Sequence, residues 1–269
     1  MASASVTTSA DALAQRFALL HGQRKRALVC YVTAGHPSPE DSVALLRAVE
    51  AAGADVIELG VPFSDPLADG PVIQASSQRA LDQGMTLDRT LEIAAAAKVS
   101  VPLVLFSYLN PIMAAGPDVL ERAARAGISG VLVTDLPVGA DPERERWLAD
   151  GPLAFVRLVA PTTPAARMAE IARHGSGFVY LISRLGVTGL QDTLAAELPA
   201  TIARLRTATD LPICVGFGIS TGEQARAVGA LADGVVVGSA IVHAAGESVQ
   251  AAATLVRGLR AALDTPIPS

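Results

Sequence analysis

The chain has 269 residues, of which 51% are hydrophobic and 17% are charged. This composition is typical of a compact globular protein and excludes an intrinsically disordered one. The net charge of -5, with no basic face, argues against nucleic acid or an anionic membrane as the main partner.

The first residues have no basic segment ahead of an apolar one, so they do not resemble a secretion signal. We expect residues 1–9 to form a flexible tail, followed by an amphipathic helix. No linker or shift in composition divides the rest, so we expect a single domain over 1–269. Cys30 and Cys214 lie in apolar runs, where free thiols are buried, and this favours the reducing cytoplasm.

Eight runs rich in β-branched residues alternate with helical stretches along the chain. The runs cover 27–33, 55–60, 102–108, 130–135, 154–160, 178–183, 212–218 and 234–240. Nearly continuous apolar runs are typical of parallel strands covered on both faces. The pattern predicts a (β/α)8 TIM barrel with an extra N-terminal helix. The alternative is an open doubly wound sheet, but "VTAGHPSPE" after the first run contains no G-x-G-x-x-G motif.

Glu58 is a lone carboxylate at the end of the second predicted strand, in "DVIELG". A charged carboxylate among Val, Ile and Leu is costly to bury. In a barrel, the carboxyl ends of the strands carry the active site, so Glu58 is a candidate catalytic residue. A carboxylate that reaches solvent or pairs with an arginine is an equally open interpretation.

Glycines follow the last three predicted strands, in "GVTG", "GFGIS" and "GSAIV". Barrel loops after strands seven and eight commonly bind phosphate, because their backbone N–H groups can approach an anion closely. We therefore expect these three loops to form a phosphate site, although each glycine alone could mark an ordinary turn.

Other chemistries have little support. His21, His36, His174 and His243 are scattered without a metal-binding motif, so we expect no metal site. Lys25 and Lys98 are the only lysines and neither lies in a predicted strand, which argues against Schiff-base chemistry.

Seven segments in sequence order resemble the alpha subunit family of tryptophan synthase. They are "YVTAGHPSPE", "ELGVPFSDPLADGPVIQ", "SYLNPI", "VTDLP", "YLISRLGVTG", "VGFGIS" and "VVVGSAIV". The chain departs from the family pattern at His36, where an acid is common, and at Leu185, where a small polar residue is common.

The resemblance implies cleavage of indole-3-glycerol phosphate to indole and glyceraldehyde 3-phosphate, with no cofactor in this chain. It assigns Glu58 as general acid-base and Asp69 as the partner of the indole N–H, with Thr188 closing onto Asp69. The positions that it assigns to substrate binding are Tyr31, Tyr108, Tyr180, Thr188, Gly189, Gly218, Gly238 and Ser239. Each tyrosine could instead simply fill the barrel mouth.

The resemblance also implies a beta subunit that carries pyridoxal phosphate and receives the indole, in an alpha-beta-beta-alpha heterotetramer. Asp65, Asn110 and Pro111 are the residues that we expect at that interface. Two alternatives are a noncatalytic barrel subunit that activates a partner and another barrel enzyme acting on a sugar phosphate.

Overall fold

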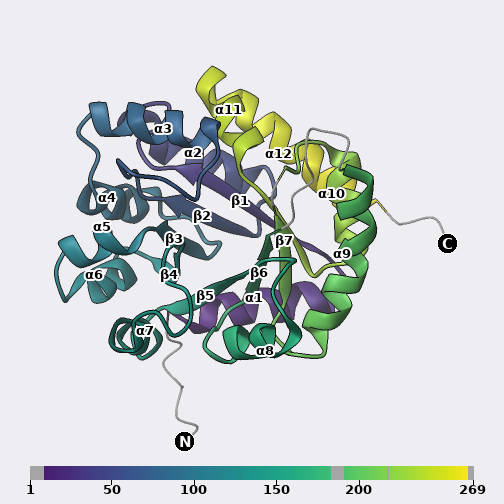
Figure 1. Cartoon of the computed structure of the whole chain (residues 1–269). Helices are drawn as coiled ribbons and strands as arrows, with labels where there is room; N and C mark the ends of the chain where they lie inside the picture. Colours follow the sequence, from purple (N-terminus) through teal and green to yellow (C-terminus); the bar gives the residue numbers. More distant parts are fainter. Residues whose placement is uncertain (1–8, 183–190, 217, 266–269) are drawn as a thin grey trace, which may run out of the picture.

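Eight parallel strands close into a barrel in sequence order, with helices around it (Figure 1). The computed structural model describes residues 9–182, 191–216 and 218–265. The strands are β1 (Ala27–Thr33), β2 (Val56–Gly60), β3 (Leu103–Ser107), β4 (Ile128–Val133), β5 (Ala154–Val159), β6 (Val179–Ile182), β7 (Ile213–Gly216) and β8 (Gly234–Val237). The predicted TIM barrel is confirmed.

The helices follow the strands and frequently begin at a capping side chain. They are α1 (Asp11–Gly22), α2 (Pro39–Ala51), α3 (Pro71–Asp82), α4 (Leu87–Ala97), α5 (Leu109–Ala114), α6 (Val119–Arg125), α7 (Pro142–Ala149), α8 (Ala165–Arg173), α9 (Gln191–Arg206), α10 (Gly222–Gly229), α11 (Ser239–Glu247) and α12 (Val249–Asp264). Ser38, Thr86, Asp141 and Ser248 each accept a hydrogen bond from a backbone N–H in the first turn of the helix that follows. None of the described helices is both long and apolar enough to cross a membrane.

Alternation along the strands separates two apolar layers. On β2, Ile57 and Leu59 belong to the layer between the strands and the outer helices, whereas Val56 belongs to the cluster inside the barrel. Because side chains alternate along a strand, Glu58 points inward with Val56. The position of the carboxylate is therefore a direct result of its place in the strand.

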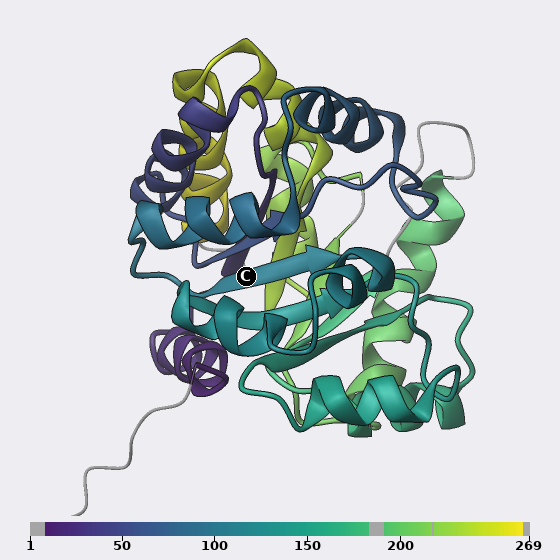
Figure 2. The same cartoon turned by 90° about the vertical axis from the view of Figure 1, so that its left-hand side faces the viewer.

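The extra N-terminal helix closes one end of the barrel. Leu13 and Phe17 of α1 are buried with the interior cluster, and the Phe17 and Phe178 rings lie 5.6 Å apart. A Cβ added at Gly130 would lie 2.8 Å from the Leu13 side chain, so this glycine leaves the space that α1 fills. Figure 2 shows the strand arrows pointing away from α1, so the active-site end is the opposite one.

Asp55 ties three parts of the closed end together. Its carboxylate accepts hydrogen bonds from Arg16 of α1 at 2.9 Å, from Arg260 of α12 at 2.8 Å and from the Leu28 backbone N–H at 2.9 Å. The carboxylate precedes β2 and is far from the carboxyl ends of the strands. We therefore assign this cluster to stability.

Candidate active site

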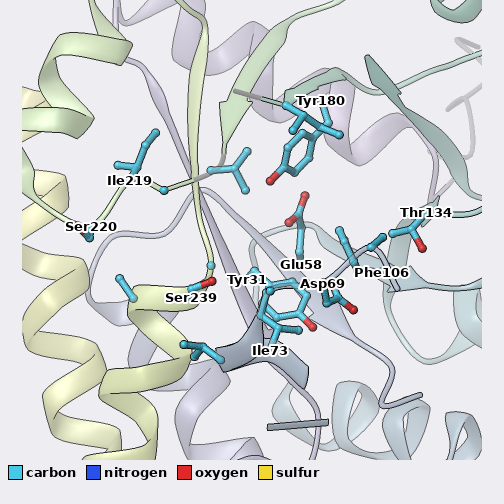
Figure 3. Close-up of a pocket in the computed structure, with 18 of the residues that line it drawn as sticks. Tyr31, Glu58, Asp69, Ile73, Phe106, Thr134, Tyr180, Ile219, Ser220 and Ser239 are labelled. Atoms are coloured by element: carbon cyan, nitrogen blue, oxygen red, sulfur yellow. The ribbon is translucent and has the colours of Figure 1, made fainter. Parts of the chain in front are cut away.

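A cavity of about 360 Å³ opens at the carboxyl ends of the strands. Seven of the predicted site residues line it, namely Tyr31, Glu58, Asp69, Tyr180, Gly218, Gly238 and Ser239. Figure 3 shows the side chains from several strands and loops converging on one space. Two further predicted residues, Thr188 and Gly189, and the departure at Leu185, lie outside the described residues.

Glu58 forms the polar centre of the cavity floor. It pairs in register with Tyr31 on β1 and with Val104 on β3, and it is only 1% exposed. Its Oε1 atom has no hydrogen-bond partner within the described part of the chain. Burial raises the pKa of Glu58 from an ordinary 4.5 to about 8. The side chain therefore does not reach solvent, and near neutral pH it is mainly a protonated acid that can donate.

Two tyrosines flank this carboxyl group. Figure 3 shows the Tyr180 hydroxyl pointing toward the Glu58 carboxyl group. Glycines on the neighbouring strands make room for both rings, because a Cβ at Gly216 would collide with the Tyr180 hydroxyl and one at Gly60 with that of Tyr31. Burial raises the pKa of each phenol, so both remain protonated and available as donors.

Asp69 is held in the cavity wall by Tyr108, which follows β3. The Tyr108 hydroxyl donates to Asp69 Oδ2 at 3.0 Å and accepts from the Ala68 backbone N–H at 2.9 Å. The Phe63 ring packs on Tyr108 with centroids 5.0 Å apart. Burial raises the pKa of Asp69, and the Tyr108 hydrogen bond opposes that rise. Tyr108 therefore binds one carboxylate oxygen of Asp69, Oδ2, and the other oxygen, Oδ1, can accept a hydrogen bond from a ligand.

The other end of the cavity is suited to an anion. Helix α11 begins at Gly238 and Ser239, and within the described residues no side chain caps it. Helix α10 differs, because Thr221 and Gln224 form a capping box, and Gln224 Oε1 also accepts from the Ser220 backbone N–H at 2.8 Å. At the start of α10, these side chains occupy backbone N–H groups, whereas at the start of α11 no described side chain does so. Unpaired N–H groups at a helix start favour the binding of a negative charge.

Sequence reasoning missed most of the apolar wall. Phe106, Leu158 and Val236 line the cavity from three different strands, and Thr134 lines it from the end of β4. The Phe106 ring meets the Tyr31 ring edge to face, with centroids 5.1 Å apart. Counting alternate positions along each strand would have identified the three strand residues. The wall offers an aromatic, apolar surface, with Phe106 beside Asp69 (Figure 3).

The remaining predicted residues lie outside the cavity. Asp65 and Asn110 are exposed and Pro111 is half-buried. His36 is 7% exposed, and its Nε2 donates to the Val242 carbonyl at 3.1 Å, which links the loop after β1 to α11. Among the described residues, no three His, Cys, Asp or Glu side chains are grouped as a metal site requires.

Comparisons with known proteins identify the family of the chain. A family model described as "Tryptophan synthase alpha chain" matches residues 17–265. A tryptophan synthase alpha chain from Rhizorhabdus wittichii is 47% identical over 259 residues, covering 95% of this chain and 96% of that protein. One from Gluconacetobacter diazotrophicus is 48% identical over 89% of both chains.

Solved structures give the same result. The crystal structure of tryptophan synthase subunit alpha from Legionella pneumophila superposes with a TM-score of 0.85 at 36% identity, covering 94% of this chain and 98% of that one. A chain of tryptophan synthase from M. tuberculosis superposes with a TM-score of 0.84 at 30% identity, covering 93% and 98%. Because the similarity extends over nearly the whole barrel and its cavity, the chain belongs to the tryptophan synthase alpha chain family.

Proposed function

We propose that this chain cleaves indole-3-glycerol phosphate to indole and glyceraldehyde 3-phosphate, with Glu58 as general acid-base and Asp69 at the indole N–H. The observation that carries this proposal is the buried Glu58 carboxyl group, whose pKa of about 8 keeps it protonated in a cavity that ends at an uncapped helix. A carboxyl group with a raised pKa can give a proton and take one back near neutral pH.

The proposed reaction needs proton transfers at two positions of the substrate. Glu58 donates its proton to indole C3, and the Asp69 carboxylate stabilises the positive charge that develops on the indole nitrogen. The bond between C3 and the hydroxyl-bearing carbon of the glycerol chain then breaks, and its electrons return to the indole ring. The Glu58 carboxylate takes the proton of that hydroxyl as the aldehyde forms, so the acid is regenerated and the protons balance.

The shape of the cavity supports this arrangement of the substrate. Phe106 and Leu158 offer apolar contact to an indole ring near Asp69, and the α11 N-terminus lies at the other end for the phosphate. Thr188 and Gly189 are proposed to complete the phosphate side. The proposed reaction uses no metal and no organic cofactor on this chain.

The activity is tested by indole release from indole-3-glycerol phosphate, measured with and without a beta subunit. Glu58→Gln keeps the side-chain volume but cannot exchange the proton, so kcat should fall about 10²- to 10⁴-fold. Asp69→Asn should behave similarly while still binding the phosphate end. A Glu58→Gln enzyme that keeps more than about a tenth of the wild-type rate would remove Glu58 from this role. A wild type that activates a beta subunit without cleaving would indicate the noncatalytic subunit.

Gly238→Ala tests the phosphate end separately. A Cβ at this position would lie 3.5 Å from the Tyr31 Cβ, an ordinary contact, so the unliganded protein accommodates it. We expect a higher KM for the phosphorylated substrate, because the methyl group stands where the backbone donors meet the phosphate. Gly218 is a less suitable test, since its φ of +79° disfavours any side chain. Unchanged competition by inorganic phosphate would contradict the assignment.

Membership in the family implies a beta-subunit partner, and we propose an alpha-beta-beta-alpha heterotetramer in the cytoplasm, with pyridoxal phosphate in the beta subunit. The surface beside the cavity supports this: Leu67 is 93% exposed and Met113 is 41% exposed, near the predicted Asp65 and Asn110. Large exposed apolar side chains are typical of interaction surfaces. The loop from Phe63 to Asp69 joins this surface to the catalytic Asp69.

Asp65→Ala tests the proposed partner surface. Asp65 is exposed, so isolated cleavage should be nearly unchanged, whereas stimulation by a saturating beta subunit should fall if docking favours the active arrangement of the loop. The plateau rates of wild type and variant are compared during titration with the beta subunit. Equal plateaus would exclude Asp65 from the coupling.

A further inference from the structure

His243 lies on α11, one helical turn beyond Ser239, and both residues line the proposed substrate cavity. Residues four positions apart lie on the same face of a helix, about 6 Å from each other. His243 is therefore one helical turn from the helix start that is proposed to hold the phosphate, on the same face of α11.

The charged side chains that line the cavity show why His243 matters for an anionic ligand. The described part of the lining contains two acids, Glu58 and Asp69, and among those described residues His243 is the one basic side chain. A phosphate monoester carries a charge of roughly -1.5 to -2 near neutral pH. The helix start supplies only partial charge, so a nearby cation would add attraction to an anion.

Other charged groups around the imidazole limit the size of this effect. On the same helix, Glu247 Oε1 lies 3.8 Å from His243 Nδ1. From other elements, Arg79 of α3 and His36 of the loop after β1 share a neighbouring cavity of about 540 Å³ with His243. The His243 side chain is 71% exposed, so solvent screens its charge. A contribution of a few-fold in affinity is therefore expected.

We propose that His243 faces the substrate phosphate and makes the site select phosphorylated indolyl substrates over unphosphorylated ones. This inference rests on the proposed function, because it takes the α11 N-terminus as the phosphate site. It adds a side-chain charge to a site that is otherwise described by backbone donors, and it assigns that charge to recognition of the substrate.

The test compares His243→Lys, which fixes a positive charge, with His243→Gln, which removes it. Two probes are titrated by calorimetry: 3-(indol-3-yl)propyl phosphate, which lacks the hydroxyl needed for cleavage, and its alcohol, 3-(indol-3-yl)propanol. The Kd for the phosphate should be lowest for Lys and highest for Gln, with about a five-fold span, as expected for a screened ion pair. The Kd for the alcohol should be the same in all three proteins. His21→Gln, an exposed histidine on α1 at the closed end, is the matched control and should change neither Kd.

The outcomes separate this inference from the proposed function. If wild type binds the phosphate more tightly than the alcohol and the Lys and Gln variants bind the phosphate equally, His243 has no such role and the backbone site stands. If wild type does not distinguish the two probes, the phosphate site itself is wrong, and the inference fails with it. Equal shifts for both probes would show a change in cavity shape and would also overturn the role of the charge.

Discussion

Glu58→Gln should make the protein more stable at alkaline pH while it removes activity. The folded-state pKa of Glu58 is about 8 against an ordinary 4.5, because burial disfavours the charged form. The folded protein therefore binds this proton more tightly than the unfolded chain. The resulting stability is fully present below the unfolded value of 4.5 and is lost progressively as the pH rises through the folded value of about 8.

The size of the effect follows from the two pKa values. Each tenfold change in proton affinity corresponds to about 1.4 kcal/mol, so the complete loss is about 5 kcal/mol. Between about pH 5.5 and about pH 8.5, Glu58 should lower the free energy of unfolding of the wild type by about 3 kcal/mol. Glutamine does not titrate, so the variant should lack this loss, and any cost of burying its amide is the same at both pH values.

Urea unfolding at a series of pH values measures this difference. The gap in unfolding free energy between Glu58→Gln and wild type should move in favour of the variant by about 3 kcal/mol across that range. Glu92→Gln, at an exposed position on α4, is the control and should keep a constant gap. A gap for Glu58→Gln that stays constant within about 0.5 kcal/mol would refute the raised pKa and with it the protonated resting state.

Three further variants test the surroundings of the site. Tyr108→Phe removes the hydroxyl that donates to Asp69, so the pKa of Asp69 should rise. We expect kcat to fall about tenfold and the acid limb of the pH-rate profile to move to higher pH. An acid limb that does not move would show that Tyr108 does not control the pKa of Asp69. Gly60→Ala places a methyl group against the Tyr31 ring, so kcat/KM and the thermal midpoint should both fall; wild-type values would show that the ring moves freely. Asp55→Asn leaves the two arginines at the closed end without their carboxylate, and urea unfolding should show a loss of about 3 kcal/mol with kcat retained.

The sequence predicted the barrel and the inward position of Glu58 because both depend on local patterns. Runs of β-branched residues identified the strands, and Glu58 points inward because alternation along β2 requires it. Tyr31 and Tyr180 follow from the same rule on their own strands. Gly238 and Ser239 were predictable because glycine at the end of the last strand precedes a helix start.

Contacts between distant segments could not be predicted in this way. The Tyr108 hydrogen bond to Asp69 joins residues 39 positions apart, and only the closed barrel brings them together. The sequence also could not separate the two helix starts near the proposed phosphate end, because "TGEQ" could offer its donors to a ligand or use them in its own cap. The structure shows that Thr221 and Gln224 use them in a capping box.

The plug that α1 forms has a consequence for the proton on Glu58. Beneath the carboxyl group the barrel is filled by Val56, Phe178 and the buried face of α1, so water can approach Glu58 only through the mouth of the cavity. A bound substrate occupies that mouth. In the proposed mechanism, Glu58 must therefore already hold the proton for indole C3 when the substrate binds. Before the substrate binds, solvent exchanges the proton on Glu58, so in heavy water the proposed cleavage should place deuterium on indole C3.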